Sequence, residues 1–282
     1  MKVEPAAAGT SAEAGAELRL ANFARSIWQQ TASSVQVPMH PAPSLPTLAD
    51  LALSGPVLPP LTEAVRIAEA CRRAALALHR TPSATLAGKD ADGRPLRGQH
   101  QHAHYVPDCR GPDPMRITNI LVYAPSGLGP SEVAALARVV DLPPYLLGEE
   151  AGVRAQLGVA LVALGQPAEL RVSALCQRHS VFASRTPFVL PRHRRPGDEP
   201  EDQLCRELRL RGLPRPLHIE RTLGPPAARG SHAWSAFRRT RRERPLTTGF
   251  CGFRIELAEP VSGPLLLGRD CHYGLGQFVP HA

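Results

Sequence analysis

Long apolar runs and paired cysteines are both missing from this chain of 282 residues. No stretch of about 20 uninterrupted apolar residues occurs, so the sequence predicts no membrane-spanning helix and no membrane partner. The six cysteines form no CxxC pair, and their spacing gives no zinc-finger pattern. No apolar segment follows Met1 and Lys2, so we expect no signal peptide. These absences favour a cytoplasmic protein with reduced cysteines.

Lysine is nearly missing as well, because it occurs only at Lys2 and Lys89. The formal net charge of +8 therefore comes almost entirely from arginine. The planar guanidinium group pairs with phosphate and stacks on bases. A pI near 9.7 is typical of proteins that bind nucleic acid, although other basic proteins share it.

The apolar pattern predicts an α+β chain. Residues 1–55, rich in Ala, Pro, Ser and Gly, are expected to be a linker or an irregular lead-in. Helices are expected at Leu61–Arg80, Ser131–Val140 and Glu201–Arg211. Strands are expected at Arg116–Ala124, Glu169–Cys176, Val181–Leu190, Leu217–Arg221 and Gly252–Glu259, with a last strand near Pro280. The order in the second half suggests a ferredoxin-like unit whose second helix is short or absent, and the first half could be a partial copy.

The segment GQHQHAHY carries three alternating histidines, His100, His102 and His104, followed by Tyr105. In an extended chain the histidines share one face, and Tyr105 lies on the other face or at the end of the strand. Histidine titrates near neutral pH and also ligates metals, so proton transfer and a metal site are both open interpretations. Asp108 and Asp113 are near enough in sequence to join a metal site. Ordinary surface histidines are the third interpretation.

Two basic stretches occur in the second half, Arg192–Arg195 and Arg238–Arg244. The second stretch is either a solvated loop or a contact with RNA, for which Trp234 and Phe237 would offer stacking surfaces.

The glycine-rich turn CHYGLGQF spans Cys271–Phe278. Glycines let a backbone approach a phosphate closely, and His272 and Tyr273 could stack on a base. The alternative is an ordinary tight turn or bulge before a strand.

Five stretches together resemble one known family: LPPLTEAVRIAE (Leu58–Glu69), GKDADGRPLRGQHQHAHYVP (Gly88–Pro107), TNILVYAPSG (Thr118–Gly127), RTPFVLPRHRR (Arg185–Arg195) and CHYGLGQF. The chain is similar to the type I-U (also called I-G) CRISPR-associated protein in which a backbone-type subunit is fused to a repeat-cleaving RNA endonuclease. The similarity covers the repeat-cleaving part. The histidine segment of that family usually reads Gly-His-x-His-Ala-aromatic-Tyr, whereas here Gln99 is extra and His104 replaces the aromatic residue.

The resemblance implies tandem ferredoxin-like (RRM-like) domains of the repeat-associated mysterious protein superfamily, which we place at residues 56–178 and 179–282. It implies binding of CRISPR repeat RNA and crRNA, and metal-independent cleavage that needs no cofactor and leaves 2′,3′-cyclic phosphate and 5′-hydroxyl ends. Other subunits of a type I interference complex are further implied partners. The alternatives are a non-catalytic crRNA-binding subunit of such a complex, or a metal-dependent hydrolase built on the histidine segment.

The expected catalytic residues are His100, His102, His104 and Tyr105, with His102 as the leading base or acid and His100 as its partner. The expected RNA contacts are basic, aromatic or glycine residues of the loops, namely Lys89, Arg94, Arg97, Arg192, His193, Arg194, Arg195, Arg238, Arg239, Arg241, Arg242, His272, Tyr273, Gly274 and Gly276.

Overall fold

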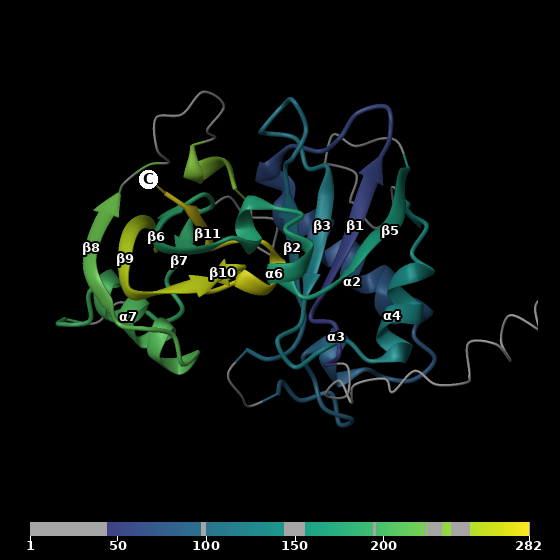
Figure 1. Ribbon diagram of the computed structural model, residues 1–282, viewed down its shortest axis with the longest axis horizontal. Coiled ribbons are helices and arrows are strands. Elements are labelled where there is room, and N and C mark those ends of the chain that lie inside the picture. The colour runs from purple at the N-terminus through teal and green to yellow at the C-terminus, as the bar shows by residue number, and fades with distance from the viewer. Residues whose placement is uncertain are drawn as a thin grey trace, which may run out of the picture. The chain divides into compact units, whose positions relative to one another are not determined.

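The computed structural model describes residues 44–96, 100–143, 156–193, 196–222, 224, 233–237 and 249–281. These residues form a mixed α+β structure with two antiparallel sheets, so the expected α+β class is confirmed (Figure 1). Residues from Leu45 onward belong to one compact unit.

The first sheet has the strand order β2-β3-β1-β5-β4. Its strands are β1 (Leu48–Ser54), β2 (His104–Asp108), β3 (Asn119–Tyr123), β4 (Asp141–Leu142) and β5 (Leu157–Gly165). Helix α2 (Ala64–Leu78) follows β1 after a 3-10 turn at Leu61–Glu63, and helix α4 (Pro130–Ala137) follows β3. The short helix α3 (Ala84–Ala87) precedes the histidine segment.

The second sheet has the order β10-β11-β6-β9-β7, and β8 pairs with β9. Its strands are β6 (Arg178–Ser184), β7 (Phe188–Val189), β8 (Pro216–Thr222), β9 (Phe250–Ser262), β10 (Leu265–Leu266) and β11 (Gln277–Pro280). Helix α7 (Pro200–Leu210) precedes β8. Short 3-10 turns lie at Trp234–Ala236 and Cys271–Tyr273.

The strands of the two sheets pair in the same pattern. In the first sheet β1 lies between β3 and β5, and β2 pairs with β3. In the second sheet β6 lies between β9 and β11, and β8 pairs with β9. Between β9 and β11 the chain forms only β10 and a 3-10 turn, where the first half has α4 between β3 and β5.

The packing joins the two halves. Helix α2 buries residues spaced three and four apart, such as Ala64, Ile67, Cys71 and Ala75, against the first sheet. A second core forms between the second sheet and α7, around Phe182, Phe188, Phe253, Phe278, Leu204 and Leu208. A third cluster contains Val106 and Leu121 of the first sheet together with Leu266 and Cys271 of the second half. Side chains from the first sheet and from the second half of the chain, far apart in the sequence, therefore pack together in this third cluster.

Two expectations about local structure are wrong. Residues 48–54, expected to be irregular, form β1 at the centre of the first sheet. The strand expected at Glu169–Cys176 is instead the helix α6 (Pro167–Leu170) and a 3-10 turn at Ala174–Cys176. A capping box between Gln166 and Glu169 starts that helix, and the hydroxyl of Ser173 accepts a hydrogen bond that caps the turn.

All six cysteines lie within the described residues and are free thiols. Among the described residues, the helices are too short or too polar to cross a membrane.

Candidate functional site

The three histidines of the GQHQHAHY segment meet His272, which the sequence places 172 residues after His100. His104 begins β2, whereas His100 adopts a left-handed conformation with φ of 56°, so the segment bends rather than continuing as a strand. The ring of His272 lies 3.9 Å from that of His102 and 3.7 Å from that of His104, measured between centroids. The rings of His102 and His104 are 6.2 Å apart, so His272 is the middle ring of a stack. We call these four residues the histidine cluster.

Hydrogen bonds fix the protons of two rings in the cluster. Nδ1 of His272 lies 3.2 Å from the carbonyl oxygen of Ala103, which can only accept, so Nδ1 carries the proton. Nε2 of the neutral ring is then an acceptor and lies 2.9 Å from Nδ1 of His100. His100 consequently donates from Nδ1, and its Nε2 keeps a lone pair.

His104 is almost fully buried, with 3% of its surface exposed. Its ring makes a hydrogen bond to the backbone of Tyr123, its partner in β3. Its Nδ1 has no hydrogen-bond partner among the described residues. A buried polar atom without a partner is costly and rare, so this nitrogen needs an explanation.

All four rings of the histidine cluster favour the neutral form. Burial, followed by the neighbouring His100 and Arg72, lowers the pKa of His102 to about 4. Burial also lowers the pKa of His100, with help from Arg211, and it holds the pKa of His104 and His272 well below the usual value. At neutral pH the cluster can therefore accept protons.

A cavity of about 120 Å³ adjoins the cluster. Its wall includes His100 and His104 from the first half, with Tyr123 of β3. From the second half, Arg211, directly after α7, and Leu265 and Leu266 of β10 also line it. Burial raises the pKa of Tyr123, so its hydroxyl keeps its proton at neutral pH.

Arg211 brings positive charge to this cavity. Its Nη1 pairs with the Glu207 carboxylate at 2.7 Å and donates to the Glu207 carbonyl, and its Nη2 lies 3.5 Å from Sγ of Cys271. Among the described residues these bonds use three of the five guanidinium donors. Two donors remain for another anion.

Tyr105 does not reach the cluster. It is fully buried among the core residues beside α2, on the opposite face of β2, and its hydroxyl donates to the carbonyl of Leu86. The expected alternation is thus correct for His104 and Tyr105. The role expected of Tyr105 in the chemistry stays a prediction, and its side chain is fully buried in this structure.

His102, the residue expected to be the leading base or acid, does not line the cavity. It stacks on His272 and packs against Gly88, where an added Cβ would come within 2.5 Å of its ring. The cavity is lined by His100 and His104 instead of His102. His100 therefore lies at the cavity and His102 does not, while the role expected of each in the chemistry stays a prediction.

The glycine-rich turn packs inside the molecule. A Cβ on Gly274 would approach Pro107 to 2.5 Å, and one on Gly276 would approach the carbonyl oxygen of Leu267 to 1.8 Å. Their N–H groups donate to the carbonyls of Cys271 and Pro187. The glycines therefore serve close packing, and they expose no donors to a phosphate.

Four aromatic side chains that were expected to stack on RNA already pack against other residues of the chain. Trp234 and Phe237 are 2% and 1% exposed and belong to the first core, against which Tyr273 also packs. His272 is the middle ring of the histidine stack. Stacking on a base would require these side chains to leave their present contacts.

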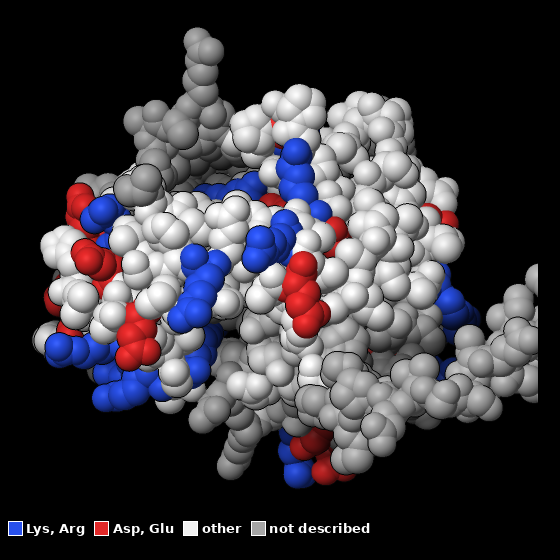
Figure 2. Space-filling view, viewed as in Figure 1, with Lys and Arg blue, Asp and Glu red and all other residues white. Residues whose placement is uncertain are grey.

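The expected basic contacts divide into two groups. Lys89, Arg94, Arg192 and His193 are exposed. The others lie outside the described residues: Arg97, Arg194, Arg195, Arg238, Arg239, Arg241 and Arg242. On the face shown in Figure 2, basic side chains gather around the position of α7.

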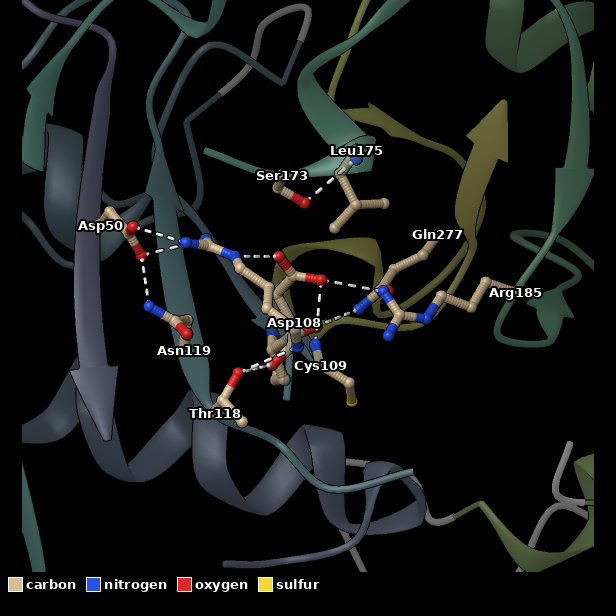
Figure 3. A network of polar contacts seen from close by, with 11 residues as sticks. Asp50, Asp108, Cys109, Thr118, Asn119, Ser173, Leu175, Arg185 and Gln277 are labelled. Carbon is tan, nitrogen blue, oxygen red and sulfur yellow. Dashed lines mark hydrogen bonds and ion pairs between the residues drawn. The ribbon is translucent and has the colours of Figure 1, made fainter. Parts of the chain in front are cut away.

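The carboxylates proposed to join a metal lie elsewhere. Asp113 caps its own loop and pairs with Arg116. Asp108 belongs to a buried network with Asp50, Arg110 and Arg185 (Figure 3).

This arginine–aspartate network connects the two halves. Nη1 and Nη2 of Arg110 bind both oxygens of Asp50 at 2.7 and 3.1 Å, and Nε binds Asp108 at 2.7 Å. Arg185, which follows β6, binds the other oxygen of Asp108 at 2.9 Å. Next to it, Gln277 of β11 donates to the carbonyl of Pro107 in β2.

Sequence reasoning missed Tyr123, Arg211 and Cys271. Tyr123 lies in a segment that the family resemblance includes, but no local pattern marks it as part of a site. Arg211 and Cys271 reach the histidine cluster only because the second half packs against the first sheet.

No protein-family model matches this chain. No curated protein matches it either. Among solved structures, one described as a Cas6 product complex is similar to this chain, with 16% sequence identity and a TM-score of 0.34 over 84% of this chain and 100% of that chain.

Proposed function

We propose that this chain is an endoribonuclease that cleaves CRISPR repeat RNA without a metal ion, with His100 as the general base. The observation that carries the proposal is the hydrogen-bonded pair of His100 and His272 beside a cavity that Arg211 also lines. The resemblance of five sequence segments to repeat-cleaving endonucleases supplies the substrate. That resemblance and the matching strand pattern of the two sheets support tandem ferredoxin-like domains, with β1 (Leu48–Ser54) in the first domain, ahead of the expected start at residue 56, and β6 opening the second at Arg178.

The pair suits proton removal. The Ala103 carbonyl holds the proton on Nδ1 of His272, whose Nε2 in turn orients His100. A proton accepted by Nε2 of His100 leaves an imidazolium that His272 stabilises through the existing hydrogen bond. In RNA the proton to be removed is that of the 2′-hydroxyl, whose oxygen then attacks the adjacent phosphorus. General base help of this kind contributes about 10²–10⁴-fold to the rate.

Two further groups complete the chemistry. The unused donors of Arg211 offer hydrogen bonds to the phosphoryl oxygens as their negative charge grows. The Tyr123 hydroxyl, which keeps its proton at neutral pH, is the donor for the leaving 5′-oxygen. The 5′-oxygen takes that proton as its bond to phosphorus breaks, and the other product ends in a 2′,3′-cyclic phosphate.

The cavity is large enough for one phosphodiester group of an RNA chain. At about 120 Å³ it is smaller than the roughly 300–1,000 Å³ of small-molecule pockets, so it admits a phosphodiester and little else. The rest of the RNA would lie outside it, where Lys89, Arg94, Arg192 and His193 are exposed. Residence in a type I interference complex, with other subunits as partners, is part of the same proposal.

The decisive experiment measures single-turnover cleavage of candidate repeat RNA in EDTA. His100→Ala should lower the rate by about 10²-fold or more and leave the RNA affinity within a few-fold. His218→Ala is the matched control, because His218 is exposed on β8 and does not line the cavity. Equal rates for the wild type and His100→Ala would reject this base. Tight binding without cleavage by the wild type would instead select a non-catalytic crRNA-binding subunit.

The product ends test the nucleophile separately. A 2′-deoxy sugar just upstream of the cut should abolish cleavage and permit binding, because only the attacking hydroxyl is lost. A metal-activated water would tolerate the deoxy sugar and stop working in EDTA. Efficient cutting of the deoxy RNA would therefore rule out the proposed mechanism.

A further inference from the structure

We propose that His100, His104, Cys271 and His272 also form a binding site for a soft divalent cation, with Zn²⁺ as the first choice. This set differs from the one that the sequence suggested, because Cys271 and His272 replace His102 and the two aspartates. Each residue presents one ligand atom, and these atoms all lie within 4.8 Å of one another.

One distance within the cluster can be compared with that of a tetrahedral site. Zn–N bonds of about 2.0–2.1 Å and Zn–S bonds of about 2.3 Å place neighbouring ligand atoms about 3.3–3.7 Å apart. Nδ1 of His100 and Nε2 of His272 are now 2.9 Å apart in a hydrogen bond. A cation would separate them by about half an ångström, which a small rotation of the partly exposed His100 ring can supply.

The outer contacts of two rings are those of metal ligands. A ligating histidine usually donates its second ring nitrogen to a carboxylate, a backbone carbonyl or water. Nδ1 of His272 donates to the Ala103 carbonyl, which leaves Nε2 for the cluster. The ring of His104 makes a hydrogen bond to the backbone of Tyr123, and its Nδ1 has no hydrogen-bond partner among the described residues, so Nε2 makes that bond.

The buried Nδ1 of His104 is the second, independent observation. It has no hydrogen-bond partner among the described residues, although only 3% of the His104 surface is exposed. His104 is nevertheless one of the four residues whose ligand atoms all lie within 4.8 Å of one another. A cation in the cluster would satisfy this nitrogen and remove the cost of leaving it unbonded.

The donor set selects the kind of metal. Three imidazoles and one thiol favour Zn²⁺ and similar soft cations over Mg²⁺ or Ca²⁺, which prefer oxygen ligands. The nearest buried carboxylates do not compete, because Glu207 pairs with Arg211 and Asp108 with Arg110 and Arg185. Binding exchanges the thiol proton of Cys271 for a sulfur–metal bond, and the proton leaves to solvent.

Occupancy has a consequence for cleavage that rests on the proposed function. A cation on Nε2 of His272 breaks its hydrogen bond with His100, and Nδ1 of His100 becomes a ligand. The pair would then no longer hold His100 as a base, so Zn²⁺ should inhibit an enzyme that is active in EDTA.

The test uses the full chain, freed of metal with chelator, and Co²⁺ as a spectroscopic probe. We expect one Co²⁺ per chain, with tetrahedral d–d absorption and a sulfur-to-cobalt charge-transfer band, and displacement by Zn²⁺. His104→Gln should weaken binding at least about tenfold, since loss of an outer partner alone typically costs 10–100-fold. Cys271→Ser should remove the charge-transfer band. Cys205→Ser and His218→Ala are matched controls outside the cluster and should bind as the wild type does.

Circular dichroism of each metal-free variant shows whether it folds. If His104→Gln does not fold, Cys271→Ser still tests the site. The site is rejected if the wild type binds no Co²⁺, or if the band survives in Cys271→Ser. The two proposals fail separately. Cleavage in EDTA without Co²⁺ binding keeps the nuclease and rejects the site, whereas Co²⁺ binding without cleavage in EDTA keeps the site and rejects the nuclease.

Discussion

Two polar clusters lie where the halves of the chain meet, and they handle charge in opposite ways. In the arginine–aspartate network both oxygens of Asp50 and of Asp108 accept hydrogen bonds from charged or amide partners. Burial alone would raise the pKa of Asp108, but Arg185 and the hydrogen bond from Arg110 lower it on balance. The network stays charged and is fully paired.

The histidine cluster is neutral and incompletely paired. Burial lowers the pKa of each ring, one buried nitrogen has no partner among the described residues, and a cavity adjoins two of the rings. A satisfied buried network rigidifies a fold, whereas an unsatisfied group beside a cavity is a candidate for function. The comparison thus predicts that the network stabilises the fold, and it favours the histidine cluster as the candidate functional site.

The largest expected effect comes from breaking the network. Asp108→Ala leaves Arg110 and Arg185 without one of their carboxylates, and removing one partner of a buried ion pair costs about 3–5 kcal/mol of unfolding free energy. Urea denaturation at neutral pH measures this loss. Asp113→Ala is the matched control, since its exposed pair with Arg116 is worth about 0–1 kcal/mol. A loss below about 1 kcal/mol for Asp108→Ala would show that the network does not stabilise the fold.

The next effect is the pH dependence of the unfolding free energy, which differs between the two clusters. The folded pKa of His102 is about 4, below the ordinary 6.5, so the unfolded chain binds more protons between these values. Stability should be fully present above pH 6.5 and fall as the pH drops toward 4. Each histidine of the cluster contributes at most about 1.4 kcal/mol per pH unit. The pKa of Asp108 is lowered from 3.8, so the network loses its contribution only below that pH.

Denaturant titrations at pH 7.5, 6.5, 5.5 and 4.5 test this order. His102→Gln removes one titrating group of the cluster and should flatten the slope between pH 6.5 and 4.5. A wild-type stability that stays constant down to pH 4.5 would mean that the rings are not held neutral by burial.

The sequence indicated part of the histidine cluster. Alternation marked His100, His102 and His104 as one group, and the glycine-rich turn drew attention to His272. That His272 joins the other three depends on the packing of β2 against the turn before β11, which no local pattern reveals. The bend at His100 was equally hidden, because a left-handed conformation is unusual for a residue other than glycine.

The fold was predicted best where the apolar pattern is long. Helix α2 lies within its expected range, and β8 matches its expected range to within one residue at each end. Strand β1 was missed because its seven residues lie in a segment rich in proline, alanine and serine. Its burial on both faces also removes the alternation that identifies an exposed strand.

The smallest expected effect concerns the surface beside each cluster. Gly88 touches His102, so the loop that carries Lys89 and Arg94 lies next to the histidine cluster, whereas Arg116 lies on the loop of Asp113. Replacing Lys89 and Arg94 together by alanine should change the unfolding free energy by no more than about 0.5 kcal/mol. If both contact phosphates of single-stranded RNA, the slope of log affinity against log salt should fall by about 1.4. Arg116→Ala should leave this slope unchanged. An equal change for both variants would show that RNA does not distinguish the two clusters, and an unchanged slope for the double variant would place the RNA away from this loop.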